Sequence, residues 1–313
     1  MDADPSLDVV AAAFTLLVDR TTARISRIFT ADGIPHLLLK GPTFGWFWPG
    51  PATRAYGDVD LLVPVARFRD AVAVLEREGF RRRPGLGLTV HSWTFDRFAG
   101  HRQTVDLHRT IPGVGMPPEL LWDALRPHSV EHRVADASVM GLDRTATTVH
   151  AVVHAASRGP DQAKNLLDVE RLLEHPATPW AAASELARSL GADQMMRIGL
   201  LQVDGGAALA ARLALGDPDP FVRHLATSSI PTKYLVKLRT VPLRHRPRLV
   251  LRQLFPTVDA LRADGPGFAR RGRLGLCAAY VARPFWLAAR LALATGAYVW
   301  FGLRARRDRG ARW

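Results

Sequence analysis

The sequence predicts an α+β protein in which a small mixed β-sheet core with helices is followed by a mainly helical C-terminal region. Within the first 117 residues, short apolar runs bounded by Gly and Pro alternate with amphipathic stretches, which is typical of strands and helices built around one sheet. After Pro117, helical spacing of apolar residues takes over. We therefore expect three regions: an α/β core over 1–117, a helical region over 118–216 that lines a substrate cleft, and a basic helical region over 217–313.

Hydrophobic spacing and turn residues place the elements of the core. Apolar side chains recur at roughly helical spacing after Ser6, which is a suitable N-cap. The run IPHLLLK stops at Gly41-Pro42, as a buried strand does where it enters a turn. In chain order we expect a helix over 7–31, a strand over 34–40, a loop over 42–57, a strand over 58–64, a helix over 66–80, and strands over 88–95 and 103–111 joined as a hairpin through Ala99-Gly100.

Apolar residues at helical spacing also predict the elements beyond Pro117. The expected helices cover 118–125, 145–157, 161–174, 180–190 and 193–214. Further on, segment 285–303 has the length of a membrane span, but it carries Arg290 and draws seven of its 19 residues from Ala and Gly. We therefore expect an amphipathic helix there, packed on the domain or lying on a membrane surface as a peripheral contact, rather than a spanning helix.

The positive charge is concentrated in the C-terminal third. From Phe221 to Trp313 there are 19 Lys and Arg against three acidic residues, a net charge of +16, whereas the first 220 residues sum to −3. Arg supplies all but four of the 42 basic residues, and the four lysines are Lys40, Lys164, Lys233 and Lys237. A region this basic suits the phosphates of a nucleotide, a nucleic acid or an anionic membrane surface.

Cysteine usage and the N-terminus indicate a cytoplasmic protein. Cys277 is the single cysteine, which excludes an internal disulfide framework and any zinc site made of several cysteines. We expect its thiol to be buried and inert within an apolar stretch. The N-terminus MDADPSLDVV is acidic, whereas a secretory signal begins with basic residues.

Two aspartates, Asp58 and Asp60, lie one residue apart in the predicted strand DVDLLVP. Residues i and i+2 of a strand project from the same face, so their carboxylates lie side by side while Val59 and Leu61 face a core. Like charges this close repel unless a cation lies between them, and Mg²⁺ is typically held by one or two carboxylates plus substrate phosphates. The alternative is a pair of solvated acids at the end of a strand.

A third carboxylate and a basic turn strengthen the metal interpretation. Asp106 lies between apolar residues in the predicted strand that contains VDLH, and it completes a triad if the two strands are neighbours. Two metals bridged by shared carboxylates stabilise both the attacking and the leaving oxygens of a phosphoryl displacement. Upstream, a glycine at Lys40-Gly41 allows backbone N–H groups to approach a phosphate closely. Lys40 and Arg54 are candidates for neutralising phosphate charge.

These motifs resemble a known group of proteins. LLLKG, then Arg54-x-x-Gly-Asp-Val-Asp-Leu-Leu-Val, then Val-Asp-Leu-His at 105–108, look like the DNA-polymerase-β-like nucleotidyltransferase superfamily. Within it, the chain is most similar to the uncharacterised nucleotidyltransferase family, and the resemblance covers residues 34–111 well. It implies a metal-dependent enzyme that uses a nucleoside triphosphate (ATP or another NTP) with Mg²⁺ or Mn²⁺.

Carried over to this sequence, the resemblance gives each carboxylate a role. Asp58 and Asp60 would bind the metals that hold the triphosphate. Asp106 would be the third carboxylate, binding one metal and accepting the proton of the attacking hydroxyl. Gly41 would begin the phosphate-contacting turn. The superfamily has a second small residue after this glycine, where this chain has Pro42, which has no N–H to donate.

The proline therefore leaves part of the triphosphate to other groups, and Lys40, Thr43 and Arg54 are the nearest candidates. His108 shares the face of Asp106 and borders the site, or it is a half-buried strand histidine. His150 and His154 lie four apart on a predicted helix, spaced as two ligands of one metal, although a structural or substrate-lining role is favoured.

Asp168 on the next predicted helix is either a solvated or capping acid or, with His154, part of the pocket, since members of the family often carry a His-bearing helix followed by an Asp-bearing one.

The leading hypothesis is a nucleotidyltransferase that moves a nucleoside monophosphate to a hydroxyl or phosphate of a small-molecule or peptide acceptor and releases pyrophosphate. The enzymatic alternative is a toxin-like nucleotidyltransferase acting on RNA, supported by the basic C-terminal region. A second alternative is a non-catalytic nucleotide-binding module on a degenerate fold. The presence of all three carboxylates argues against that decay.

Overall fold

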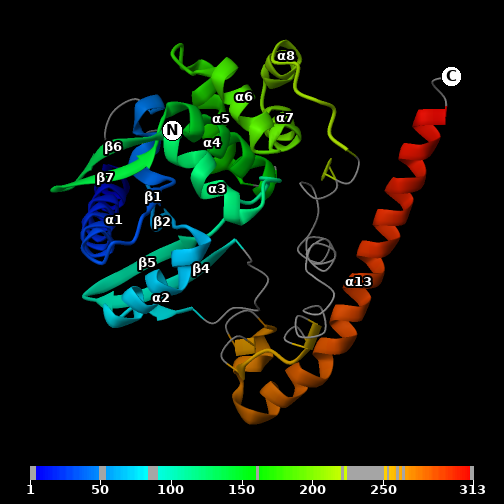
Figure 1. The fold of residues 1–313 in the computed structure, drawn as a ribbon. Helices are drawn as coiled ribbons and strands as arrows, with labels where there is room; N and C mark the ends of the chain where they lie inside the picture. Colours follow the sequence, from blue (N-terminus) through cyan, green and yellow to red (C-terminus); the bar gives the residue numbers. More distant parts are fainter. Residues whose placement is uncertain are drawn as a thin grey trace. The chain divides into compact units, whose positions relative to one another are not determined.

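The computed structural model describes residues 5–48, 54–83, 91–159, 162–219, 222–223, 250–251, 254–258, 261–262 and 265–310. The chain divides into two compact units, one formed by Met1–Arg83 with His91–Asp217 and the other by Pro84–Val90 with Pro218–Trp313. The first unit contains a seven-stranded sheet with helices, and the second ends in a long helix (Figure 1).

In the part of the chain described, the first unit begins with strands interspersed with helices and ends with five successive helices. Its helices are α1 (Pro5–Ala31), α2 (Phe68–Arg77), α3 (Pro118–Leu125), α4 (Arg144–Arg158), α5 (Ala163–Glu174), α6 (Trp180–Ser189), α7 (Asp193–Leu200) and α8 (Gly206–Arg212). Its strands are β1 (Leu37–Leu38), β2 (Val59–Leu62), β3 (Arg81–Arg82), β4 (Ser92–Ala99), β5 (His101–His108), β6 (Ser129–Val134) and β7 (Ala137–Leu142). Three 3₁₀ turns connect them: η1 (Gly41–Phe47), η2 (Val65–Arg67) and η3 (Arg126–His128).

The sheet is mixed, as the sequence predicts. Its strand order is β3-β4-β5-β2-β1-β7-β6. The pairs β2–β5 and β1–β7 are parallel, and the other four pairs are antiparallel. The predicted hairpin through Ala99-Gly100 is confirmed as β4–β5, with Gly100 at φ +74° in the turn, a conformation that favours glycine. Strands β2 and β5 are direct neighbours, as a carboxylate triad requires.

One face of the sheet is packed and the other carries polar groups. Alternate residues of the central strands, such as Val59, Leu61, Val105 and Leu107, enter a single apolar cluster. Helices α1 and α2 close this cluster with side chains such as Phe29. Because strand residues alternate between faces, the intervening residues of β2 and β5 project from the opposite side.

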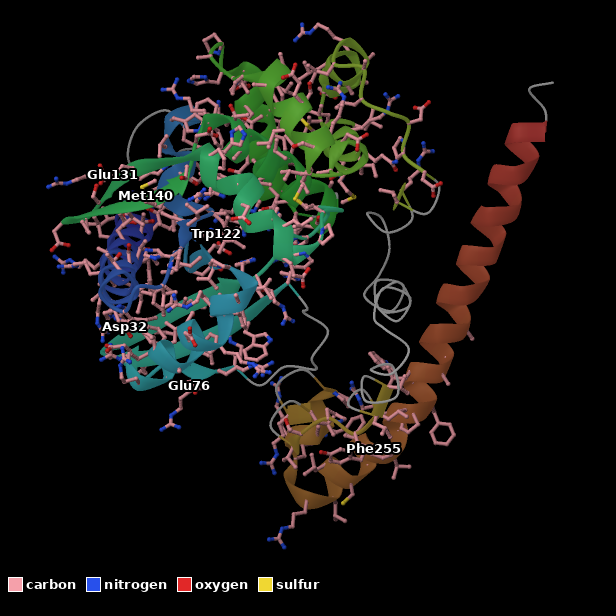
Figure 2. The ribbon with its side chains drawn as sticks, viewed as in Figure 1. Asp32, Glu76, Trp122, Glu131, Met140 and Phe255 are labelled. Atoms are coloured by element: carbon pink, nitrogen blue, oxygen red, sulfur yellow. The ribbon has the colours of Figure 1, made fainter. Side chains whose placement is uncertain are left out.

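The sequence does not predict the hairpin β6–β7. The two strands pair antiparallel around the two-residue loop Ala135-Asp136, and β7 joins the sheet beside β1. Ala135 adopts φ +51°, and the loop lacks the Asn-Gly or Asp-Gly pair that usually signals such a turn. Figure 2 labels Glu131 and Met140, which are register partners on the two strands. The helices predicted within 118–216 leave residues 126–144 unassigned, and this hairpin lies in that segment. The division into three regions stays a prediction.

Several element bounds also differ from expectation. The strand expected over 34–40 is only two residues long, and η2 takes the start of the helix expected over 66–80. The expectation of a single helix over 193–214 is wrong. Helix α7 ends at Leu200, and a second helix, α8, begins at Gly206. Gly205, the residue before α8, has φ +76° and makes the sharp turn between the two. The other helices lie within a few residues of their predicted positions.

The described part of the second unit consists chiefly of η5 (Gly267–Arg270) and α13 (Gly272–Gly310), and Pro284 lies inside α13. Leu261, Ala269 and Ala279 form a small apolar cluster there. Cys277 is exposed, so the expectation of a buried thiol is wrong. Among the described residues, no helix combines the length and apolarity needed to cross a membrane. A peripheral contact of 285–303 with a membrane stays a prediction.

The hairpin β6–β7 provides a test of the fold. Val139 of β7 is fully buried in the main apolar cluster, whereas Val130 of the partner strand is 45% exposed. Val139→Ala should lower the free energy of unfolding of the first unit by about 2 kcal/mol, because it loses apolar burial and leaves a cavity. The measurement is urea unfolding followed by tryptophan fluorescence.

The matched control is Val130→Ala, for which we expect a change within about 0.5 kcal/mol. Equal effects of the two substitutions would show that β7 does not contribute to this core.

Candidate active site

The site is built on the polar face of β2 and β5. These strands run parallel, and Asp60 is the register partner of Asp106. The flanking residues of both strands face the apolar cluster, so the two carboxylates project together from the opposite face. Asp60 is only 3% exposed. The sequence predicts a carboxylate triad only if these two strands are neighbours, and the structure shows that they are.

A histidine joins the two aspartates. One ligand atom from each of Asp60, Asp106 and His108 lies within 4.8 Å of the others. His108 Nε2 lies 2.9 Å from Asp60 Oδ1, and the His108 side chain is 7% exposed. Among the described residues, these three side chains are grouped closely enough to hold a metal ion together. Asp58 is not one of them. Asp58 precedes β2 and is half-buried.

Asp60 is held in its charged form. Lys40 lies between β1 and the turn η1, and its Nζ donates to Asp60 Oδ1 over 3.2 Å. Burial acts to raise the pKa of Asp60, but the ammonium of Lys40 and the hydrogen bond from His108 outweigh it and hold that pKa well below its usual range. Asp60 is therefore a buried, ionised carboxylate.

Asp58 has the opposite electrostatic environment. Burial raises the pKa of Asp58, and the charges of Asp60 and Asp106 raise it further. Lys40 and Lys164 act in the other direction without cancelling the effect. An added cation would relieve this repulsion.

Two further atoms indicate that the site suits a cation. Asp106 Oδ1 and His108 Nδ1 are buried and have no hydrogen-bond partner among the described residues. Buried polar atoms are normally paired, so each unpaired atom in a structure calls for an explanation. The donor set of carboxylate oxygens and an imidazole nitrogen fits a divalent metal ion.

The turn after β1 depends on Gly41. Its φ of +71° lies in the left-handed region, and a Cβ at this position would come within 3.1 Å of the Tyr56 ring. Tyr56 is fixed in turn by its hydroxyl, which donates to Asp19 Oδ1 over 2.5 Å. Thr43, in the same turn, is fully buried and donates to the Leu39 carbonyl oxygen over 3.2 Å. Its hydroxyl therefore serves the turn itself.

Arg54 and Asp168 meet in a buried ion pair. Arg54 Nε and Nη2 donate to the two oxygens of Asp168 over 2.6 and 2.8 Å. Trp48 Nε1 donates to Asp168 Oδ1 over 3.1 Å, and the guanidinium lies 4.4 Å from the centre of the Phe44 ring. Asp168 is only 2% exposed, so the interpretation of Asp168 as a solvated acid is wrong. These contacts tie helix α5 to Trp48 and to Arg54, which lies four residues before Asp58.

Lys164 is a residue that sequence reasoning missed. Its Nζ donates to the Ala55 carbonyl oxygen over 2.5 Å. Burial and the charge of Arg54 lower the pKa of Lys164, and the carboxylates of Asp168 and Asp58 partly offset this. A signal was present, because Lys40 and Lys164 are the only two lysines in the first 220 residues of an arginine-rich chain. Both act electrostatically on Asp58.

The two histidines of α4 stay neutral at physiological pH. His150 Nδ1 donates to the Leu39 carbonyl oxygen over 3.0 Å, and burial together with the Lys40 charge lowers the pKa of His150 to about 3. His154 lies next to it with ring centroids 5.9 Å apart, and burial also lowers its pKa well below the usual range. His154 Nε2 has no partner among the described residues. Neither histidine belongs to the group formed by Asp60, Asp106 and His108.

The chain is similar to one protein family and, more distantly, to solved structures. The family model described as uncharacterised nucleotidyltransferase matches residues 9–204. One similar solved structure is an antigenic nucleotidyltransferase-like protein from Paracoccidioides brasiliensis, at 14% identity, with 66% of this chain and 96% of that chain covered and a TM-score of 0.38. Another is the antibiotic-resistance factor ANT(2'')-Ia, at 17% identity, with 64% and 93% covered and a TM-score of 0.34. No curated protein matches the sequence.

The family model spans more than half of the chain, and it includes the strands, the turn and the helices that carry the acidic site. The protein therefore belongs to the uncharacterised nucleotidyltransferase family.

Proposed function

We propose that the protein is a metal-dependent nucleotidyltransferase. It transfers a nucleoside monophosphate from a nucleoside triphosphate to a hydroxyl or phosphate of a small-molecule or peptide acceptor. The observation that carries the proposal is the in-register pairing of Asp60 with Asp106 on adjacent parallel strands, with Asp58 beside them, in a chain of this family.

The three carboxylates share one task in this proposal, which is to hold the metal, and Asp106 has a second. Asp58, Asp60 and Asp106 hold the divalent metal, Mg²⁺ or Mn²⁺, which when bound offsets the charge of the triphosphate and of the transition state. The acceptor oxygen attacks the α-phosphorus, the bond between that phosphorus and the pyrophosphate oxygen breaks, and pyrophosphate leaves. Asp106 accepts the proton of the attacking hydroxyl, since its Oδ1 has no other partner among the described residues.

Basic groups near Asp58 receive the triphosphate in this proposal. They are Lys40, the N–H groups of the turn at Gly41, and Lys164 of α5, and both lysines act electrostatically on Asp58. Pro42 has no N–H to donate to the triphosphate, and in this proposal Lys164 supplies part of the missing contact. A guanidinium has five N–H donors, and Asp168 takes two of those of Arg54, so Arg54 both positions the loop and remains a proposed phosphate contact.

Thr43, which is buried, supports the same turn from within. We also propose that His154 of α4 lines the acceptor pocket and that Asp168 of α5 acts through its ion pair with Arg54.

We expect Asp60→Asn and Asp106→Asn to lower nucleotidyl transfer by about 100-fold or more, because each removes a charge that holds the metal. The measurement uses α-labelled ATP, CTP, GTP and UTP with Mg²⁺ or Mn²⁺ and a cell extract as the source of acceptor. Mass spectrometry then identifies the labelled product.

Asp204→Asn is the matched control, since Asp204 is exposed in the turn before α8, and it should keep full activity. Unchanged transfer in both site variants would contradict the proposal. A labelled RNA product would favour the toxin-like alternative, and nucleotide binding without any transfer would favour the non-catalytic one.

The two neighbouring aspartates should affect stability in opposite directions when no metal is present. The pKa of Asp58 is raised in the folded protein, so its ionised form destabilises the fold, and Asp58→Asn should raise the melting temperature at pH 7.5. This advantage should shrink as the pH falls through the raised pKa, because the wild-type carboxyl then becomes neutral.

The pKa of Asp60 is lowered, so its ionised form contributes stability that is present above its ordinary pKa and lost as the pH falls through the folded value. Asp60→Asn should therefore lower the free energy of unfolding at pH 7.5, by about 3 kcal/mol, since it leaves the half-buried ammonium of Lys40 without its partner. Thermal unfolding in chelator measures both variants, and shifts of the same sign would contradict this electrostatic account.

A further inference from the structure

His108 is more deeply buried, and lies closer to Asp60 and Asp106, than a residue that only borders the site would need to be. It ends β5 two residues after Asp106, on the same face, and its register partner on β2 is Leu62. Its side chain is 93% buried, and one of its nitrogens lies within 4.8 Å of ligand oxygens of both Asp60 and Asp106. Its Nδ1 is buried without a partner among the described residues.

We propose that His108 is itself a metal ligand, so that Asp60, Asp106 and His108 form a mixed oxygen and nitrogen site that binds a first-row transition ion, such as Mn²⁺ or Co²⁺, more tightly than Mg²⁺. The proposal rests on the metal centre of the proposed function and specifies its metal. Mg²⁺ strongly prefers oxygen ligands, whereas imidazole suits transition ions.

The contact between His108 and Asp60 supports this assignment. An ionised carboxylate only accepts hydrogen bonds, so the 2.9 Å contact places a proton on Nε2, facing Asp60 Oδ1. A cation can take the place of that proton if the proton moves to Nδ1, because both facing atoms then offer a lone pair to the cation. Asp58, the other aspartate near the pair, is not in this group of three.

The neighbourhood also keeps His108 in place. The His91 ring lies 5.8 Å from the His108 ring, and Ser92 is its register partner on β4. Val63 N donates to the His108 carbonyl oxygen over 3.0 Å, which continues the β2–β5 pairing. A ligand held on two strands in this way needs little reorganisation to bind a metal.

The competing role for His108 is orientation of Asp60 through the hydrogen bond alone. The two roles differ in whether nitrogen touches the metal. His108→Asn keeps an amide that can donate to Asp60 but removes the imidazole ligand. His108→Asp instead supplies a third carboxylate, which converts the site to oxygen ligands only.

The test uses the full chain, freed of metal and without nucleotide. Affinities for Mn²⁺, Co²⁺ and Mg²⁺ are measured by calorimetry, and pulsed electron paramagnetic resonance of the Mn²⁺ complex detects nitrogen bound to the metal. We expect nitrogen coupling in the wild type and none in His108→Asn. We also expect the ratio of Co²⁺ to Mg²⁺ affinity to fall at least about tenfold in both variants, since even loss of an outer partner of a metal ligand costs 10–100-fold.

His101→Asn, at the other end of β5, is the matched control and should keep both the coupling and the ratio. Absence of nitrogen coupling in the wild type, or an unchanged affinity ratio in His108→Asn, would overturn the inference, and the wild-type spectrum decides even if a variant fails to fold. Nitrogen coupling without any nucleotidyl transfer would remove the proposed function and leave this inference standing. Nucleotidyl transfer without nitrogen coupling would overturn this inference and leave the proposed function standing.

Discussion

The structure of the site depends on one constraint, which is that a buried carboxylate, Asp60, lies beside a half-buried one, Asp106, across the β2–β5 pair. Asp60 and Asp106 are register partners on adjacent strands, so the sheet holds their side chains next to each other. Water cannot screen a carboxylate that is 3% exposed, so the protein has to supply the compensating charge. Lys40 supplies this charge for Asp60 and His108 adds a hydrogen bond, whereas Asp58 keeps a raised pKa.

The remaining features of the first unit hold that arrangement in place. The Tyr56 ring and Gly41 fix the turn that carries Lys40, and His150 of α4 donates to the backbone of the residue before Lys40. On the other side, the pair of Arg54 with Asp168 secures the loop that ends at Asp58. Helix α5 therefore serves the site through its contacts with a loop, although none of its residues lies in the group of three metal-ligating side chains.

The acidic part of the site is predictable from the sequence, because a carboxylate inside an apolar strand can be placed by strand alternation alone. The hairpin β4–β5 and most helices follow from local patterns of this kind. The pairing of Asp60 with Asp106 also needs β2 and β5 to be neighbours, which the sequence leaves open. The hairpin β6–β7 does not, since Ala135 adopts its left-handed conformation without a glycine signal. The contact of Arg54 with Asp168 joins residues 114 positions apart, and no local pattern reports such a distance. Lys164 could have been noticed through the rarity of lysine, but its place beside Ala55 and Asp58 needed the fold.

The central claim is that the carboxylates of β2 and β5 bind a divalent cation together with a nucleoside triphosphate. Anomalous X-ray diffraction from crystals grown with Mn²⁺ and a non-hydrolysable triphosphate tests it most directly. The account predicts a manganese peak in contact with both Asp60 and Asp106, with the triphosphate bound to the same ion and next to Lys40. A triphosphate bound elsewhere, with no manganese between these two carboxylates, would contradict it.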